Sequence, residues 1–259
     1  MKAVVVYEPG GPEKLIYTEV PTPEVKPGWS LVRVKGFGIN HSEIFTRKGQ
    51  SPSVKFPRIL GIECVGVIEE TTDEDRLPKG QKIVSIMGEM GRAFDGGYAE
   101  FALLPNEQIY PVETDLPWDM LAAIPETYYT AFGSLKNLRI GSGDRVLVRG
   151  GTSGVGIAFL RRSRSKEETL LSEGFDEVII ETDGKLETGE TFDKVLELIG
   201  PATLRDTFSH VNEGGIVCST GQLGGEWYLN GFEPIMELPA NGYLTSFYSG
   251  NVDGARLQE

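Results

Sequence analysis

Apolar and polar positions alternate in short runs through the first 115 residues, and turn-forming residues separate the runs. The runs predicted as strands are Ala3–Tyr7, Leu15–Val20, Ser30–Gly36, Cys64–Glu69, Gln81–Met87, Gly97–Leu104 and Gln108–Val112. Proline and glycine lie between several of them, as in Pro9-Gly10-Gly11-Pro12 and Pro78-Lys79-Gly80. Strands at this regular spacing, with such turns between them, predict a barrel or a sandwich.

From about residue 116 helix and strand patterns alternate. Helices are predicted from Pro117, over Glu126–Leu138, from Gly154 and over Pro201–Val211. Strands are predicted over Asp144–Arg149, Glu177–Glu181, Phe192–Leu198, Gly215–Ser219 and Tyr243–Tyr248. Such alternation predicts a parallel sheet with crossover helices. The sequence thus predicts two domains, residues 1–115 and 116–259.

A glycine-rich turn follows the predicted strand Asp144–Arg149 and opens the next predicted helix. It reads Gly150-Gly151-Thr152-Ser153-Gly154-Val155-Gly156. Glycines let the backbone approach the phosphates of a dinucleotide, and the N–H groups at a helix start face the anion. The spacing of its glycines is a variant of the usual dinucleotide-binding motif. The prediction of a dinucleotide site therefore depends on the position of the turn directly after a strand.

Charge and composition narrow the possible partners. The net charge of −13 argues against a general binder of nucleic acids or acidic membranes. No apolar run has the length of a membrane span, and the N-terminus lacks the apolar core of a signal peptide, so we expect a cytoplasmic protein. The two cysteines, Cys64 and Cys218, are expected to be buried free thiols.

The chain resembles the zinc-free quinone oxidoreductase branch of the medium-chain dehydrogenase/reductase superfamily, the zeta-crystallin-like proteins. The resemblance is carried by Gly38-Ile39-Asn40-His41-Ser42-Glu43, Gly61-Ile62-Glu63-Cys64-Val65-Gly66, Gly96-Gly97-Tyr98-Ala99-Glu100, Val146–Gly156 and Ser246-Phe247-Tyr248-Ser249-Gly250. It implies an α/β plus β fold. A GroES-like β-barrel domain over 1–115 would precede a Rossmann-type doubly wound parallel-sheet domain over 116–259.

The resemblance also implies that no zinc is bound. Zinc members of the superfamily carry a cysteine where Asn40 stands and a histidine where Ile62 stands. Asparagine and isoleucine cannot supply the thiolate and imidazole that zinc favours. His41 and His210 are the only histidines, and their contexts differ.

By the same resemblance Asn40 lies near nicotinamide and substrate, where its amide could donate to a developing oxyanion. The alternative is an asparagine that ties down the turn before a helix. Phe45 and Tyr98 are further candidates for substrate contact, although packing is the alternative for Tyr98. Some relatives carry a tyrosine at the Phe45 position, so a tyrosine proton donor cannot be transferred there.

The resemblance implies NADPH as cofactor. Arg164-Ser165-Lys166 looks like the cluster that meets the 2′-phosphate in phosphate-specific relatives, and a solvated basic helix face is the alternative. Besides residues Gly151–Gly156, the cofactor candidates are Thr130, Gly200, Gly221 and Phe247. The carboxyl ends of parallel strands bind ligands in open α/β sheets, which agrees with the two glycines. Burial in the sheet is the alternative for Phe247.

The crossover after the glycine turn is too short for the family pattern. Twenty residues separate Gly156 from Glu177, enough for one helix and a turn but not for helix, strand and helix. Residues near 160–164 therefore look absent, as does the C-terminal return to the barrel. Three explanations stay open: residues omitted from the sequence across a gap, a natural or engineered deletion, or a fold that reconnects differently.

These observations predict an NADPH-dependent reductase of quinones or α,β-unsaturated carbonyls that transfers hydride directly. The alternative is a non-catalytic NADPH-binding protein with a sensor or crystallin-like structural role. A small-molecule substrate and no nucleic acid or membrane partner are expected. Relatives commonly pair through edge strands, and Tyr243–Tyr248 is the candidate edge for a homodimer.

Overall fold

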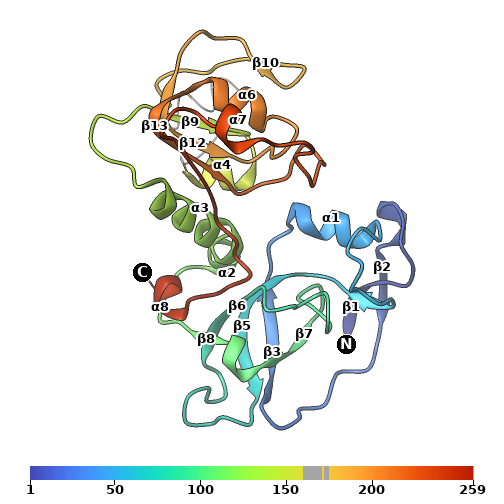
Figure 1. The fold of residues 1–259 in the computed structure, drawn as a ribbon. Coiled ribbons are helices and arrows are strands. Elements are labelled where there is room, and N and C mark those ends of the chain that lie inside the picture. The colour runs from blue at the N-terminus through green and yellow to red at the C-terminus, as the bar shows by residue number, and fades with distance from the viewer. Residues whose placement is uncertain (160–170, 172–174, 259) are drawn as a thin grey trace. The chain divides into compact units, whose positions relative to one another are not determined.

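The chain passes between two structural units twice, after Glu126 and after Tyr248. A computed structural model of the protein describes residues 1–159, 171 and 175–258 (Figure 1). Unit 1 comprises Met1–Glu126 and Ser249–Glu259, and unit 2 comprises Thr127–Tyr248. Residues 116–126 and 249–259, which the sequence placed in the second domain, therefore belong to the first unit. The chain does return to the barrel, where α8 (Gly254–Gln258) packs through Leu257.

Unit 1 is built on a five-stranded antiparallel sheet in the order β7-β3-β5-β6-β8. Its strands are β3 (Trp29–Gly36), β5 (Glu63–Glu70), β6 (Lys82–Ile86), β7 (Phe101–Pro105) and β8 (Tyr110–Pro111). A three-stranded sheet has the order β2-β1-β4, with β1 (Lys2–Val6), β2 (Ile16–Glu19) and β4 (Arg58–Ile59). Helices α1 (His41–Arg47) and α2 (Trp118–Ala122) and two short 3-10 helices, at Pro12–Lys14 and Asn106–Gln108, belong to the same unit.

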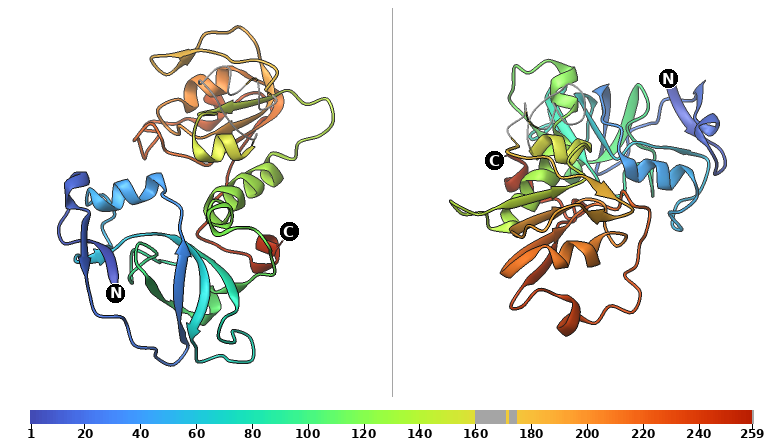
Figure 2. Two further views of the ribbon diagram at one scale, coloured as in Figure 1. Left: turned by 180° about the vertical axis from the view of Figure 1, so that it is seen from behind. Right: turned by 90° about the horizontal axis from the view of Figure 1, so that it is seen from above.

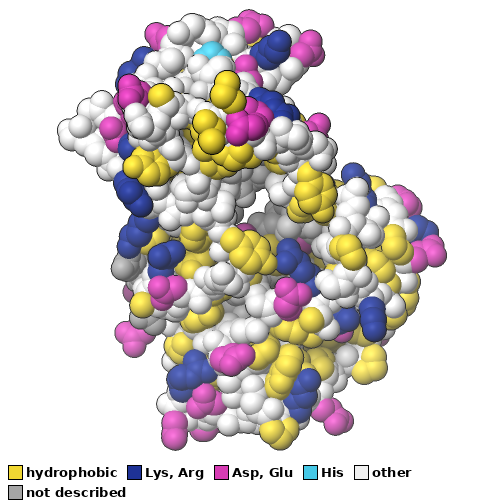
Figure 3. Space-filling model, in the orientation of Figure 1, with side chains coloured by type: hydrophobic (Ala, Val, Ile, Leu, Met, Phe, Trp, Pro, Cys, Tyr) yellow, Lys and Arg dark blue, Asp and Glu magenta, His cyan; other side chains and the backbone are white. Residues whose placement is uncertain are grey.

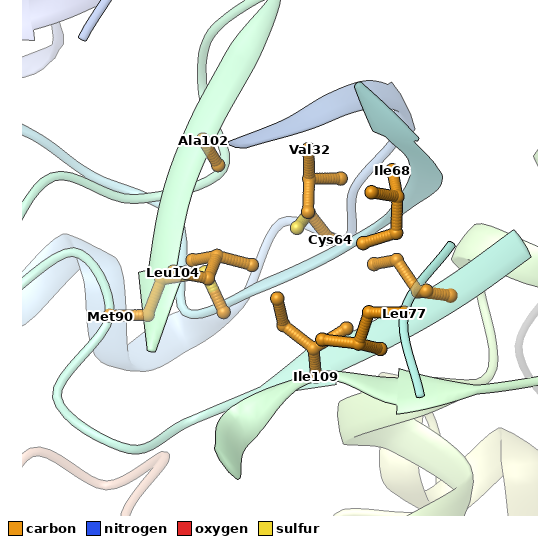
Figure 4. Packing of buried hydrophobic residues seen from close by; sticks show 9 residues of the cluster. Val32, Cys64, Ile68, Leu77, Met90, Ala102, Leu104 and Ile109 are labelled. Carbon is orange, nitrogen blue, oxygen red and sulfur yellow. The ribbon is translucent and has the colours of Figure 1, made fainter. Parts of the chain in front are cut away.

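The core of unit 1 lies where alternate side chains of the larger sheet meet. Its buried members are Val32, Cys64, Ile68, Leu77, Ile83, Met90, Ala102, Leu104 and Ile109, most of which are labelled in Figure 4. Alternation with a period of two sends every second residue of β7 into this cluster. Both cysteines are buried and free, as predicted.

Unit 2 holds a four-stranded parallel sheet in the order β14-β13-β12-β9. Figure 1 labels β9, β12 and β13 of this sheet, and Figure 2 shows the same ribbon from two further directions. Its strands are β9 (Val146–Arg149), β12 (Phe192–Glu197), β13 (Val211–Ser219) and β14 (Tyr243–Ser246). The described helices are α3 (Pro125–Leu138), which begins in unit 1, α4 (Gly154–Phe159), α6 (Leu204–Ser209) and α7 (Pro234–Glu237). In the part of the chain that the structure covers, no helix is both long and apolar enough for a membrane crossing.

The strand predicted over Glu177–Glu181 is wrong. Residues 175–180 form no strand, and β10 (Glu181–Thr182) pairs only with β11 (Lys185–Leu186) in an antiparallel hairpin outside the parallel sheet. Ile179 packs against the buried cluster of unit 2 instead, so an apolar run buries a side chain without strand pairing. Residues 160–170 and 172–174 lie outside the described residues, so the three explanations for the short crossover stay predictions.

Candidate functional site

The four parallel strands of unit 2 end on one row. Arg149, which ends β9, is paired in register with Glu197 at the end of β12. Glu197 is paired with Ser219 of β13, and Ser219 with Ser246 of β14. The glycine turn, Gly200, Gly221 and Phe247 each follow one of these strand ends. The fold therefore brings these cofactor candidates to the carboxyl edge of a single sheet, where open α/β sheets bind ligands.

The turn after β9 is closed by its own hydrogen bonds. The Ser153 N–H donates to the Gly150 carbonyl at 2.9 Å, and the Gly156 N–H donates to Ser153 Oγ at 3.1 Å, so Ser153 caps α4. A Cβ on Gly156 would lie 2.7 Å from the Gly150 oxygen, which excludes any side chain there. The N–H groups of Gly154 and Val155 have no carbonyl partner within the helix and can face an anion. The remaining predicted members, Gly151 and Thr152, form the middle of the turn.

Gly200 and Gly221 follow β12 and β13 and lie against each other. Gly200 has a φ of +91°, and a Cβ there would lie 2.8 Å from the Gly221 carbonyl oxygen. A Cβ on Gly221 would lie 2.1 Å from the Leu198 carbonyl oxygen. Close backbone packing at the strand ends requires both glycines, and their contact with a cofactor stays a prediction.

Thr130 and Phe247 lie where α3 packs against the segment after β14. Thr130 is buried, and its carbonyl accepts from Ser134 Oγ at 2.7 Å. The Phe247 ring sits so close to α3 that a Cβ on Gly133 would lie 2.0 Å from it, and it meets the Tyr129 ring edge-on at 5.5 Å. These contacts bury Phe247, which was the alternative to a cofactor contact. Contact between Phe247 and a cofactor stays a prediction.

The predicted 2′-phosphate cluster, Arg164, Ser165 and Lys166, lies outside the described residues. Its part in the choice between NADPH and NADH stays a prediction.

In unit 1, Asn40 precedes α1 and forms a capping box with Glu43. The Asn40 N–H donates to Glu43 Oε2 at 2.7 Å, and Asn40 Nδ2 donates to Glu63 Oε1 at 2.7 Å. The turn-forming role left open for Asn40 is thus present. A carboxylate accepts hydrogen bonds only, so the amide nitrogen must point toward Glu63. Among the residues that the structure describes, one Nδ2 proton serves Glu63 and the second is left for another acceptor.

Glu43 and Tyr98 form a buried pair. The Tyr98 hydroxyl donates to Glu43 Oε2, and the Ile62 N–H donates to Glu43 Oε1 at 2.8 Å. Burial raises the pKa of Glu43, while the hydrogen bonds from Tyr98 and from the backbone of Asn40 and Ile62 oppose the rise. Burial, with the Glu43 charge next, raises the pKa of Tyr98. Tyr98 is thus buried and hydrogen-bonded to Glu43, which agrees with the packing role that the sequence left open. Contact between Tyr98 and a substrate stays a prediction.

Glu63 begins β5 and is only 1% exposed. Its Oε1 accepts from Asn40, and its Oε2 accepts from the Glu126 N–H at 2.8 Å. Burial raises the pKa of Glu63 to about 7; the hydrogen bonds from Asn40 and Glu126 lower it, and the charges of Glu126 and Glu43 raise it further. A carboxyl group with a pKa near neutrality beside a candidate catalytic amide is a functional-site signal.

Phe45 lies on α1, where its ring meets the exposed His41 ring edge-on at 5.0 Å. The structure brings Phe45 to the helix that Asn40 caps. Among the described residues, no three His, Cys, Asp or Glu side chains are grouped so that they could hold a metal ion. That the reaction needs no zinc stays a prediction.

Sequence reasoning missed Arg149, the polar centre of unit 2. Arg149 is 2% exposed, donates twice to Glu181 Oε2 at 2.9 and 3.0 Å and once to Thr207 Oγ1 at 2.8 Å, and pairs with Asp206 at 2.9 Å. Its Nε lies 4.0 Å from the buried Glu197. A charged residue closing an apolar strand was the only signal, because its partners are far away in sequence and follow no spacing.

Comparison with known proteins adds independent evidence. Residues 26–114 match the family model of the alcohol dehydrogenase GroES-like domain. The chain is also similar to the quinone oxidoreductase of Homo sapiens, with 28% identity over 248 residues that cover 86% of this chain and 74% of that protein.

Solved structures show the same two-part fold. The structural match to a Bacillus subtilis protein with NAD bound covers 100% of this chain and 85% of that protein's chain, with a TM-score of 0.80 and 22% sequence identity. The match to a mycobacterial protein in complex with NADPH covers 99% of this chain and 85% of that protein's chain, with a TM-score of 0.82 and 23% sequence identity. The predicted fold class, a GroES-like barrel domain followed by a Rossmann-type domain, is confirmed.

Proposed function

Because the chain belongs to the quinone oxidoreductase branch of the medium-chain dehydrogenase/reductase superfamily, we propose that it catalyses the NADPH-dependent reduction of quinones or α,β-unsaturated carbonyls. Hydride passes directly from the nicotinamide to the substrate, and zinc takes no part. The observation that carries this proposal is the common row of four strand ends, from which the glycine turn and the other cofactor candidates follow.

The residues of unit 2 fit a dinucleotide. Gly156 leaves no side chain in the turn, and Ser153 caps α4 without using the N–H groups of Gly154 and Val155. We assign those two groups to the pyrophosphate, because N–H groups at the start of a helix attract an anion. The cofactor supplies the hydride when bound, and the relatives solved with NAD and with NADPH make a nicotinamide dinucleotide the natural candidate.

The choice of NADPH over NADH rests on sequence. Arg164, Ser165 and Lys166 carry the positive charge and hydroxyl group that suit a 2′-phosphate, whereas an NAD-preferring site favours an acidic residue there. Comparing kcat/KM for NADPH and NADH tests this choice. A preference for NADH would contradict it.

We assign Asn40 as the hydrogen-bond donor to the substrate oxygen. Hydride addition places negative charge on the substrate oxygen, and a conjugated quinone or enone spreads that charge over its π-system. A modest donor is then sufficient, and the second Nδ2 proton of Asn40 is such a donor because Glu63 holds the first. Asn40 in place of a cysteine and Ile62 in place of a histidine support chemistry without zinc.

The test is to mix the protein with NADPH and 9,10-phenanthrenequinone and follow the loss of nicotinamide absorbance, with metal analysis of the same sample. We expect turnover without stoichiometric zinc. NADPH binding without oxidation, across several quinones and enals, would reject the enzyme and favour the non-catalytic alternative. Loss of turnover on treatment with a chelator would reject the zinc-free mechanism.

We also propose that the protein is a homodimer joined at β14. This strand ends the order of the parallel sheet and carries the exposed side chains of Tyr243 and Leu244. Ile235 and Met236 of α7 in the same unit are more than four-fifths exposed, and Figure 3 shows hydrophobic side chains on this part of the surface. Among the described strands, β14 pairs with β13 alone. Apolar surface beside such a strand edge favours pairing with a second chain.

A further inference from the structure

Glu63 occupies a space that the surrounding backbone keeps for it. It is buried at the start of β5, and a Cβ on Gly38 would lie 2.0 Å from its Oε1. A residue with any side chain at position 38 would push the carboxylate away. The carboxylate is therefore held in one place by packing as well as by its hydrogen bonds.

The two oxygens of Glu63 serve two different segments. Oε1 accepts from Asn40 Nδ2 at 2.7 Å, and Oε2 accepts from the Glu126 N–H at 2.8 Å. The Glu126 N–H lies in the first turn of α3, where a backbone donor has no partner within its own helix. Both partners donate, so the ionised carboxylate accepts on both of its oxygens.

The segment held by Oε2 is the junction between the units. Glu126 is the last residue of unit 1 before the first crossing, and Ser249 is the first residue of unit 1 after the second crossing. Ser249 Oγ donates to Glu126 Oε1 at 2.7 Å. Asn40, Glu63, Glu126 and Ser249 thus form one chain of hydrogen bonds within unit 1.

We propose that Glu63 is a positioning residue that fixes the Asn40 amide with one oxygen and the start of α3 with the other. The same side chain would then hold both the proposed substrate donor, Asn40, and the two places where the chain passes between the units. The part that concerns catalysis rests on the proposed function of Asn40. Only glutamate meets the requirement: glutamine offers one acceptor oxygen, and aspartate is shorter by one methylene group.

A double-variant cycle tests whether Glu63 acts through Asn40. The variants are Glu63→Gln, Asn40→Ala and the two combined, and Glu70→Gln, at the exposed far end of β5, is the control for loss of one charge. We expect Glu63→Gln to lower kcat about tenfold, the worth of one hydrogen bond, with the NADPH dissociation constant unchanged. In the Asn40→Ala background it should lower kcat no further. Independent, multiplicative losses would overturn the proposal.

Two measurements do not depend on turnover. The side-chain amide resonances of Asn40, identified by their absence in Asn40→Ala, should shift in Glu63→Gln and stay in place in Glu70→Gln. The backbone amide of Glu126 should exchange with deuterium faster in Glu63→Gln. If neither changes, the proposal is wrong whatever the enzyme does. If both change but the native protein reduces no quinone, the anchor stands and the proposed function fails.

Glu63→Asp is the second variant, in case Glu63→Gln does not fold. It keeps the charge, but its carboxylate cannot reach both donors. Either the Asn40 resonances or the Glu126 exchange rate should change, and full retention of both would overturn the proposal.

Discussion

Arg149 and Glu197 are register partners at the ends of two neighbouring parallel strands, and both side chains are buried. Each is satisfied by several partners: Arg149 by Glu181, Asp206 and Thr207, and Glu197 by Thr207 and the N–H group of Gly200. The hydrogen bonds of Arg149 and Glu197 therefore stabilise the strand ends that the cofactor candidates follow, including the segment at Gly200.

Replacing Arg149 should destabilise unit 2 strongly. Arg149→Leu leaves buried or half-buried carboxylates without their cation, which costs about 3–5 kcal/mol of unfolding free energy. Urea unfolding followed by circular dichroism measures it. The control is Arg205→Leu, since the exposed Arg205 pairs with Glu237 at the surface and its loss should cost less than about 1 kcal/mol. Equal effects of the two substitutions would contradict the assigned role of Arg149.

Asn40 variants separate capping from chemistry. Asn40→Ala should lower kcat about 100-fold by removing an oxyanion donor. It should cost about 1 kcal/mol of stability by removing the cap of α1 and about 1–3 kcal/mol more by leaving the buried Glu63 Oε1 without its donor. Asn40→Ser restores a capping side chain but not the amide that donates to Glu63, so only the stability lost with the cap should recover while kcat stays low. Steady-state kinetics and thermal unfolding of both variants provide the measurement. Recovery of kcat in Asn40→Ser would show that Asn40 only caps the helix.

Alanine substitutions at Gly154 and Gly156, in the first turn of α4, should affect different properties. Gly156→Ala places a Cβ 2.7 Å from the Gly150 oxygen and should destabilise the fold. At Gly154 the nearest atom to an added Cβ is Thr127 Oγ1 at 4.0 Å, so Gly154→Ala should leave stability equal or up to about 1 kcal/mol higher. The NADPH dissociation constant of Gly154→Ala should nevertheless rise, because the methyl group blocks the approach of the pyrophosphate. Unchanged NADPH affinity in a fluorescence titration would remove the turn from the proposed cofactor site.

Ionisation of Glu63 should make stability fall with rising pH. Its pKa is about 7 in the folded protein and 4.5 in the reference state, so the folded state binds more protons between these values. The contribution of Glu63 is fully present below pH 4.5 and is lost as the pH rises through 7, a change of about 3 kcal/mol. Burial is the largest cause of this raised pKa; the hydrogen bonds from Asn40 and Glu126 lower it, and the charges of Glu126 and Glu43 raise it.

The measurement is unfolding free energy against pH for the native protein and for Glu63→Gln. The difference between the two curves should change by roughly this amount between pH 5 and pH 8, in favour of the variant at higher pH. Parallel curves would mean that Glu63 titrates at its ordinary pKa.

The proposed dimer predicts elution at about twice the 28.4 kDa mass of the chain. Leu244→Lys places a charge on β14 and should shift the protein to the monomer position in size-exclusion chromatography. Lys194→Leu, on the interior strand β12, tests whether any charge change has the same effect. A native protein that elutes as a monomer would reject the dimer.

The strands of unit 1 were predictable because one face of each packs on a core, so side-chain alternation is visible in sequence. The four strands of the parallel sheet were also found, from their short apolar runs. Such a run does not distinguish a paired strand from a segment that only buries a side chain, which is why the prediction around Ile179 was wrong.

The polar networks could not be predicted. Asn40 was singled out because of the family motif, but Glu63 gains its importance from Glu126, which is 63 residues away in sequence. Arg149 and Glu181 are likewise separated by 32 residues. Hydrogen bonds between residues so far apart follow no sequence period, and only the folded chain brings the donors and acceptors together.

The hydrogen bond between Ser249 and Glu126 joins two residues that are 123 positions apart. Everything between them, Thr127–Tyr248, is unit 2. Unit 2 is therefore an insertion into the chain of unit 1, whose residues on either side of the insertion remain hydrogen-bonded to each other. Such an arrangement suits modular exchange: another domain with neighbouring termini could be spliced between the same two residues without separating the strands of the barrel.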